Sequence, residues 1–245
     1  MALKVTLLDH SGFLVETDKE LLVFDDYRDP SRSVVRTIEH HPNKPVVFFV
    51  THRHPDHFNR YIFNIGQQDK RRYVLSSDIP GTEVNDNAPV DWIENGRSIE
   101  NIFGDVTVRA FGSTDAGVSL LVTLGSGETI FYAGDLNFWH WEKESTAEEV
   151  QKQQNEFTKI LGRISEEINA VDIAFFPVDV RLGDNCAAGA VQFMAKISVN
   201  DFFPMHFNGD HELACSALAS HMPEDVAERT TVHCLYREGE HTTLS

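Results

Sequence analysis

The stretch FVTHRHPDHF, residues 49–58, places three histidines and an aspartate within six consecutive positions, directly after an apolar run. His52 and His54 are two positions apart on an extended segment, so their rings face the same side. The following proline ends that segment and is expected to begin a helix, whose first turn carries Asp56 and His57. Neighbouring imidazoles suit a borderline cation such as zinc. The stretch therefore predicts two adjacent metal sites, one held by the first two histidines and the other by Asp56 and His57.

The composition limits which partners are plausible for this chain. Its 245 residues are 41% hydrophobic and 24% charged, which is typical of soluble domains. The formal net charge is −17, from 21 Lys and Arg against 38 Asp and Glu. Such a surface repels phosphate backbones and anionic membranes, so we expect neither nucleic acid nor a membrane as a partner. We expect a small-molecule substrate, and the sequence is silent on the oligomeric state.

The ends and the cysteines bear on the compartment. The segment over residues 1–13 has no cleavable apolar core, and no later stretch approaches 18 apolar residues. Cys186, Cys215 and Cys234 are far apart and lack CxxC spacing. We therefore expect buried, reduced thiols in a cytoplasmic protein.

The first half of the chain has the pattern of short strands, and the second half alternates helices with strands. Strands are expected within residues 4–10, 12–17, 21–26, 45–52, 98–112 and 118–135, with a hairpin turn at GSGE, residues 125–128. An amphipathic helix over 146–169 is followed by a strand at 171–179, a helix at 185–198, a strand end at 201–207 and a helix at 211–222. No repeat or linker interrupts the chain. We expect one α/β domain over residues 1–245, with sheets covered by helices.

The segment THRHPDH, residues 51–57, resembles the HxHxDH signature of the metallo-β-lactamase-like hydrolases. This resemblance implies an α/β fold, a four-layer αββα sandwich with a dinuclear metal site between its two sheets. It extends in order along nearly the whole chain. The opening LLDHSGFLVET, residues 7–17, looks most like the subgroup that contains ascorbate-phosphate lactonase-like proteins.

Three further motifs extend the resemblance to the rest of the expected site. LLVFDD resembles the family's first motif, an aspartate that ends an early strand, which maps to Asp25 with Asp26 as the alternative. FYAGDLN resembles the motif whose aspartate bridges both metals, which maps to Asp135. FFPMHF resembles the last motif, a histidine after a strand, which maps to His206. The resemblance also implies that Asp25 fixes a ligating histidine in place without binding metal itself.

One position of the family's ligand set is not filled by a histidine. The family usually places a histidine between the HxHxDH cluster and the bridging aspartate, but the corresponding stretch here, RAFGSTDAGVSLLV, contains none. Ser113 aligns nearest to that position and is followed by Thr114 and Asp115. We expect Asp115 to replace the histidine, because a carboxylate binds zinc, manganese or iron whereas a hydroxyl is a poor ligand. A turn aspartate is the alternative. A carboxylate there would shift selectivity towards manganese or iron.

Other histidines lie outside these motifs. In FWHW, Trp139 and Trp141 flank His140, which is a candidate catalytic residue as substrate ligand, proton donor or additional metal ligand. An aromatic segment packed in the core is the alternative. For His10 we expect a strand-end histidine that is hydrogen-bonded to the backbone. Six histidines lack a partner pattern and are expected at the surface or in packing: His40, His41, His211, His221, His233 and His241.

Together these features predict a hydrolase that uses two divalent metal ions to activate water against a small ester, lactone or phosphoester. Zinc is favoured, with manganese or iron as alternatives. Asp135 would bridge the ions, while Asp56 would bind metal and orient the nucleophile. A nuclease of the same fold is one alternative, which the acidic charge disfavours. The other is a degenerate, non-catalytic site that keeps one structural metal or binds a ligand.

Overall fold

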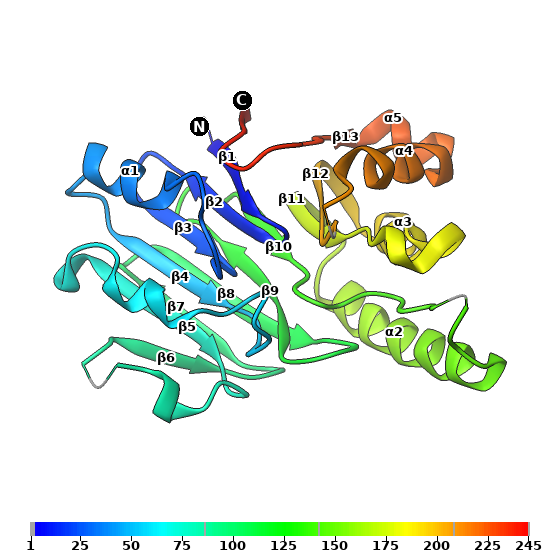
Figure 1. The fold of residues 1–245 in the computed structure, drawn as a ribbon, viewed down its shortest axis with the longest axis horizontal. Helices are drawn as coiled ribbons and strands as arrows, with labels where there is room; N and C mark the ends of the chain where they lie inside the picture. The colour runs from blue at the N-terminus through cyan, green and yellow to red at the C-terminus, as the bar shows by residue number, and fades with distance from the viewer. Residues whose placement is uncertain (1–2, 86, 142, 208, 245) are drawn as a thin grey trace.

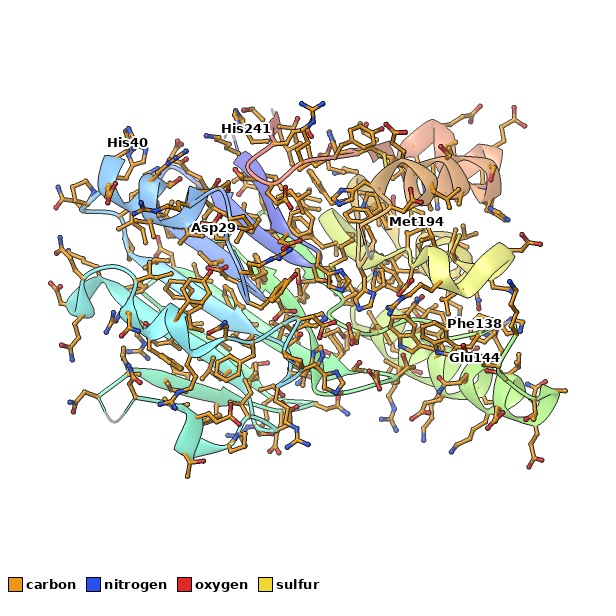
Figure 2. The ribbon with its side chains drawn as sticks, in the orientation of Figure 1. Asp29, His40, Phe138, Glu144, Met194 and His241 are labelled. Carbon is orange, nitrogen blue, oxygen red and sulfur yellow. A yellow bond between two sulfur atoms is a disulfide. The ribbon has the colours of Figure 1, made fainter. Side chains whose placement is uncertain are left out.

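Two β-sheets stack face to face, and helices cover the outer side of each (Figure 1). This computed structural model describes residues 3–85, 87–141, 143–207 and 209–244. Side chains fill the space between the sheets (Figure 2). The four-layer αββα sandwich expected from the sequence motifs is confirmed.

The first sheet is built mainly from the N-terminal part of the chain. Its strand order is β14-β1-β2-β3-β4-β5-β6. The strands from β14 to β3 pair antiparallel, and those from β3 to β6 pair parallel. The strand bounds are Leu3–Asp9 (β1), Gly12–Glu16 (β2), Leu21–Phe24 (β3), Val46–Val50 (β4), Arg71–Ser76 (β5), Val90–Ile93 (β6) and His241–Leu244 (β14).

The second sheet has the order β13-β12-β11-β10-β9-β8-β7. The strands from β7 to β10 pair antiparallel, and those from β10 to β13 pair parallel. Its strand bounds are Ser98–Ile102 (β7), Val106–Gly112 (β8), Val118–Thr123 (β9), Thr129–Tyr132 (β10), Ala170–Pro177 (β11), Ser198–Met205 (β12) and Thr231–Val232 (β13).

The helices form the two outer layers. Helix α1 (Ser33–His40) lies beside the first sheet, and the others lie on the side of the second sheet (Figure 1). These are α2 (Ala147–Glu167), α3 (Ala188–Lys196), α4 (His211–His221) and α5 (Glu224–Arg229). The longest, α2, begins at a capping box in which Thr146 and Glu149 satisfy each other's backbone N–H groups. Within the described residues, no helix combines the length and apolarity that a bilayer crossing requires.

Consecutive phenylalanines in one strand serve two different layers, because side chains alternate across a strand. In β4, Phe49 stacks on Phe24 in the core between the sheets, with ring centroids 4.9 Å apart. Its neighbour Phe48 stacks on Tyr73 at 5.2 Å, in the core on the α1 side of the sheet. In β11, Phe175 likewise packs on the first sheet, whereas its neighbour Phe176 packs on the helices α2 and α3. The continuous apolar runs of the sequence are therefore strands buried on both faces.

Parallel pairing brings the carboxyl ends of several strands to one edge of the sandwich. Strands β3 and β4 run parallel in the first sheet, and β1 shares their direction because two antiparallel pairings separate it from β3. Strands β10, β11 and β12 run parallel in the second sheet. The loops that leave these ends carry the candidate site residues.

The local structure after β4 differs from the sequence prediction. Residues 55–57 form a single turn, in which the backbone N–H groups of His57 and Phe58 both donate to the His54 carbonyl, at 3.0 and 2.9 Å. No helix continues from this turn, because Asn59 adopts an extended conformation and caps a new 3₁₀ helix, η1 (Arg60–Asn64). Helix α1 and strands β5 and β6 were not predicted, because their short runs are interrupted by charged and polar residues.

Two of the three cysteines are joined, so the prediction of reduced thiols is wrong for them. Cys215 of α4 forms a disulfide with Cys234, and only Cys186 is a free, buried cysteine. The bonded residues are 19 positions apart, and their Cα atoms lie at 6.2 Å because the segment after β13 returns beside α4. Disulfides are rare in reducing compartments, so the cysteines no longer support a cytoplasmic location.

Thiol titration of the denatured protein tests this pairing. Without reductant we expect one reactive thiol per chain, and after reduction three. A Cys215→Ser/Cys234→Ser variant should lose about 3 kcal/mol in its free energy of unfolding, because the unfolded chain is no longer cross-linked. Urea denaturation measures this loss. Three thiols in the unreduced protein would contradict the disulfide.

Candidate metal centre

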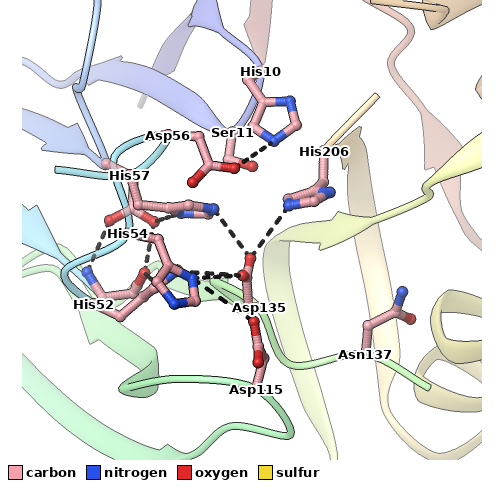
Figure 3. Close-up of polar contacts among 12 residues, drawn as sticks. His10, Ser11, His52, His54, Asp56, His57, Asp115, Asp135, Asn137 and His206 are labelled. Atoms are coloured by element: carbon pink, nitrogen blue, oxygen red, sulfur yellow. Dashed lines mark hydrogen bonds and ion pairs between the residues drawn. The ribbon is translucent and has the colours of Figure 1, made fainter. Parts of the chain in front are cut away.

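Imidazoles and carboxylates from both sheets converge on Asp135 (Figure 3). They come from the loops that follow strands β1, β4, β10 and β12. Their candidate ligand atoms form two groups, in each of which all atoms lie within 4.8 Å of one another. One group is His52, His54 and Asp135; the other is His10, Asp56, His57 and His206. The two pairs expected from HxHxDH thus fall into separate groups.

The Asp135 carboxylate lies between the two groups and faces both. Its Oδ2 atom is 3.3 Å from His52 Nε2 and 4.0 Å from His54 Nδ1. Its Oδ1 atom is 3.1 Å from His57 Nε2 and 3.5 Å from His206 Nε2. Each oxygen therefore serves a different set of imidazoles, which is the arrangement that a bridging ligand requires.

Two buried carboxylates behind the site fix the orientation of the histidine rings. Asp25 Oδ2 accepts from His57 Nδ1 at 2.8 Å and from the Thr51 hydroxyl at 2.7 Å. Asp179 Oδ2 accepts from His206 Nδ1 at 3.0 Å. Since Nδ1 is engaged on the outer side, Nε2 of each ring points at Asp135, as is usual for histidines that bind metal. Asp179 was missed in the sequence, although it follows a buried strand just as Asp25 does.

Asp26, the alternative to Asp25, has a different environment. It accepts a hydrogen bond from the Tyr61 hydroxyl, and its other carboxylate oxygen is buried without a hydrogen-bond partner in the described residues. Burial raises the pKa of Asp26 to about 7. The first motif of the sequence is therefore represented at the site by Asp25.

His10 lies in the site, contrary to the expectation of a strand-end histidine bonded to the backbone. Its ring packs on that of His206 with centroids 4.2 Å apart, and its Nε2 lies 3.6 Å from Asp56 Oδ2. Its carbonyl accepts from the His206 backbone N–H at 3.2 Å, which ties the two loops together. Burial lowers the pKa of His10. The available signal was its position directly after a buried strand, like the other site histidines.

Left-handed backbone occurs at three residues of the site, and at three further non-glycine residues elsewhere in the described chain. His10, Asp25 and His206 have φ values of 48°, 42° and 62°, in the left-handed region that non-glycine residues rarely adopt. All three directly follow strands or strand ends. The surrounding contacts therefore hold the backbone in a conformation that turns each side chain inward.

Two glycines allow the other loops to pack onto the HxHxDH segment. A Cβ atom at Gly117 would lie 1.9 Å from the Thr51 carbonyl oxygen, and one at Gly134 would lie 2.9 Å from the Thr51 hydroxyl. Both glycines also have positive φ. The loops that carry Asp115 and Asp135 therefore come within van der Waals distance of the histidine cluster only because these positions lack a side chain.

The stretch that lacks the expected histidine presents Asp115 towards the site. Asp115 Oδ2 lies 3.8 Å from His54 Nδ1, and the side chain is about half exposed. Ser113 accepts a hydrogen bond from the Asp115 backbone N–H, and the Thr114 hydroxyl bonds the carbonyl of Asn137 at 2.6 Å. The Ser113 hydroxyl is thus used within this loop and the Thr114 hydroxyl in a contact to the loop after β10, whereas Asp115 lies at the margin of the ligand groups.

A pocket of about 240 Å³ opens beside the ligands. Candidate ligands line one part of it, and Trp139, Trp141, Gln153 and Arg181 line another. His140 is not among the lining residues; its ring packs on Phe138, with centroids 5.6 Å apart. The structure therefore brings the two tryptophans to the site and leaves His140 outside it.

The remaining histidines lie away from the site. His40 and His241 are exposed at the surface (Figure 2). His233 is packed, stacking on Phe203 with centroids 4.7 Å apart, and His211 stacks on Phe207 at 4.2 Å. These positions agree with the surface or packing roles expected for them.

The donor set fits a divalent cation. His10 Nε2, His57 Nε2 and Asp135 Oδ1 are buried and have no aligned hydrogen-bond partner in the described residues. Burial opposes charging of His57, but the carboxylates of Asp135 and Asp25 outweigh it and raise its pKa. Burial likewise opposes the charge on Asp135, and the histidines overcome it and lower its pKa. Cations between these groups would bind the free nitrogen and oxygen atoms and balance the negative charge of the carboxylates.

Sequence comparison alone does not classify the chain: no protein-family profile and no curated protein matches it. Solved structures do match. Igni18, a metallo hydrolase from Ignicoccus hospitalis, has a TM-score of 0.68 at 15% identity, over 100% of this chain and 99% of that one. YhfI, a metallo-β-lactamase fold protein from Bacillus subtilis, has a TM-score of 0.62 at 11% identity, over 99% of each chain. The chain therefore has the metallo-β-lactamase fold.

The same fold also carries other chemistry among the matches. CmlA, a diiron β-hydroxylase from Streptomyces venezuelae, has a TM-score of 0.61 at 10% identity, over 99% of this chain and 54% of that one. At such identities the likeness concerns the fold. The more specific resemblance to ascorbate-phosphate lactonase-like proteins stays a prediction.

The buried Asp26 carboxyl makes stability depend on pH. Its folded pKa of about 7 lies above the value of about 4 expected when unfolded, so its stabilising protonated form is lost as pH rises towards 7. The side chain of an Asp26→Asn variant stays neutral at every pH. The free energy of unfolding of this variant should therefore rise relative to that of the wild type as pH increases from about 4 to 8. The gain is on the order of 1.4 kcal/mol for each pH unit that separates the folded from the unfolded pKa. Urea denaturation across this range measures it, with the exposed Asp18→Asn as control. A parallel pH dependence of all three proteins would refute the assignment.

Proposed function

We propose that this protein is a metal-dependent hydrolase that acts on a small ester, lactone or phosphoester. The observation that carries the proposal is the Asp135 carboxylate, whose two oxygens face separate groups of inward-pointing imidazoles. The likeness in fold to Igni18, a metallo hydrolase, supports it.

Two divalent ions would be held by the two groups of ligands. His52, His54 and Asp115 would hold one, and Asp56, His57 and His206 the other, with Asp135 shared and His10 beside the second. When bound, such ions supply Lewis acidity, lowering the pKa of a water molecule and polarising the substrate's carbonyl or phosphoryl group. Imidazole favours zinc, and the added carboxylates favour manganese or iron.

We assign the orientation of the attacking water to Asp56. Its side chain is partly exposed to the pocket, and its Oδ2 lies 3.6 Å from His10 Nε2. The contact with His10 lowers the pKa of Asp56, so its carboxylate is charged and accepts hydrogen bonds at neutral pH. In this proposal Asp56 accepts a hydrogen bond from the water and fixes its direction of attack.

The size of the pocket supports a small substrate. A volume of 240 Å³ lies just below the range of about 300–1,000 Å³ that is usual for pockets that bind small molecules. Apart from the candidate ligands, Thr114 and Arg181, the lining consists of Trp139 and Trp141, from the loop after β10, and Gln153, from the helix α2. We propose that these two segments, together with Arg181, select the substrate.

Elemental analysis tests metal binding directly. Protein expressed in metal-supplemented medium should carry up to two transition-metal ions per chain, and His52→Ala/His54→Ala should lose at least one of them. His221→Ala/His241→Ala, which removes two exposed histidines, is the matched control and should keep the wild-type content. Metal-free wild-type protein, or unchanged content after the first substitution, would reject the proposal.

The role of Asp115 is tested by a comparison of three variants. Asp115→Ala should lower metal occupancy and reduce hydrolysis of 4-nitrophenyl acetate or bis(4-nitrophenyl) phosphate by at least about tenfold, because a ligand is lost. Ser113→Ala should change both much less. Asp115→His should recover binding and shift preference towards zinc. Full occupancy and rate in Asp115→Ala would show that Asp115 is a turn residue.

A further inference from the structure

A cation and two stacked tryptophans line the pocket that contains the candidate ligands. Arg181 belongs to the 3₁₀ helix η4 (Val180–Asn185), which follows β11. The rings of Trp139 and Trp141 are parallel to within 8°, with centroids 6.1 Å apart. The Arg181 guanidinium lies 5.3 Å from the centre of the Trp141 ring. The pocket thus joins the ligand groups to an aromatic wall and a guanidinium group.

One edge of the Arg181 guanidinium is fixed by Asp179. Arg181 Nε donates to Asp179 Oδ1 at 2.9 Å and to Oδ2 at 3.0 Å, and Nη2 donates to Oδ2 at 2.5 Å. The Asp179 carboxylate also holds His206. A guanidinium has five N–H donors, and within the described residues Nη1 makes no hydrogen bond. Because Arg181 lines the pocket, these remaining donors are available to a molecule inside it.

The charge of the surroundings bears on the second edge of the guanidinium, the one that carries Nη1. Arg181 is the one lysine or arginine among the described residues that line the pocket, in a chain whose net charge is −17. Such a chain repels anions over most of its surface, so a positively charged side chain in the pocket favours the binding of an anionic substrate there. The ion pair with Asp179 uses only one edge of the guanidinium, so it does not account for the edge that carries Nη1. Gln153, whose Oε1 is buried without a hydrogen-bond partner in the described residues, offers an acceptor in the same pocket.

We propose that Arg181 binds an anionic group of the substrate, a carboxylate or a phosphate, through the guanidinium edge that Asp179 does not use. A flat or apolar part of the same molecule packs against Trp139 and Trp141. The inference rests on the proposed function, since the bond to be cleaved would lie at the candidate metal ligands. It narrows the substrate to a small anionic ester, lactone or phosphoester.

A binding experiment tests the proposal without relying on catalysis. Metal-loaded protein is titrated with benzoate, phenyl phosphate and the neutral benzamide, and binding is followed by the fluorescence of the pocket tryptophans. We expect at least one anion to bind roughly tenfold or more tightly than benzamide, as charge-assisted hydrogen bonds allow. In Arg181→Gln this preference should fall to near unity. The preferred anion identifies the group as carboxylate or phosphate.

Two further variants control for charge and for structure. Arg60→Gln removes an exposed arginine outside the pocket and should behave as wild type. Arg181→Lys keeps an ion pair with Asp179, and should keep the metal content while losing most of the preference, since an ammonium engaged with Asp179 presents no second edge. The metal content of every variant is measured beside its titration. If Arg181→Gln has lost metal, the anion preference of Arg181→Lys decides whether Arg181 binds the anion.

The results that overturn the inference differ from those that overturn the proposed function. The role of Arg181 is rejected if the wild type shows no preference for anions, or if both Arg181 variants keep the wild-type preference. In either case any anion binding is assigned to the metal ions. Hydrolysis is measured separately with 4-nitrophenyl acetate and 4-nitrophenyl hemisuccinate, a neutral and an anionic ester with the same leaving group. If neither of these esters nor bis(4-nitrophenyl) phosphate is cleaved while the anion preference depends on Arg181, the hydrolase proposal fails and the binding site stands.

Discussion

The Asp135 carboxylate, buried between two groups of imidazoles, is the interaction on which the rest of the site depends. Burying this charge is unfavourable unless opposite charge surrounds it, and the histidines that surround it come from loops of both sheets. The sandwich is therefore closed at this edge by polar contacts, while apolar packing holds it elsewhere. A substitution at this edge affects both sheets, because the first sheet contributes histidines and the second contributes Asp135 and His206.

The orientation of the candidate metal ligands is set by buried carboxylates, by glycines and by left-handed backbone around them. Asp25 and Asp179 are fully buried and hold histidine rings from behind, so the rings have lost their rotational freedom before any ligand binds. Gly117 and Gly134 bring two loops against Thr51, and left-handed backbone at His10 and His206 turns those rings inward. These features cost conformational free energy that the packed sandwich offsets.

In the proposed function, the features of the pocket serve different parts of one substrate molecule. The candidate metal ligands would act on the bond to be broken, the tryptophan pair would contact a flat part of the substrate, and Arg181 would bind a negative charge. Asp179 connects these parts physically, since one carboxylate holds both His206 and Arg181. The position of the Arg181 guanidinium is thereby tied to the position of a candidate metal ligand.

The sequence by itself determined the features that depend on local order: the HxHxDH cluster, the buried strands and the helix α2. Alternation and helical periodicity are properties of neighbouring residues, so they are visible without a fold. The tertiary structure alone decided that His10 joins His206, that Cys215 pairs with Cys234, and that Arg181 enters the pocket. It also placed Trp139 and Trp141 in the pocket and left His140 outside it. The reason is that these contacts join residues far apart in the chain, or depend on which side of a loop faces the interior, and only the packing of the two sheets fixes either.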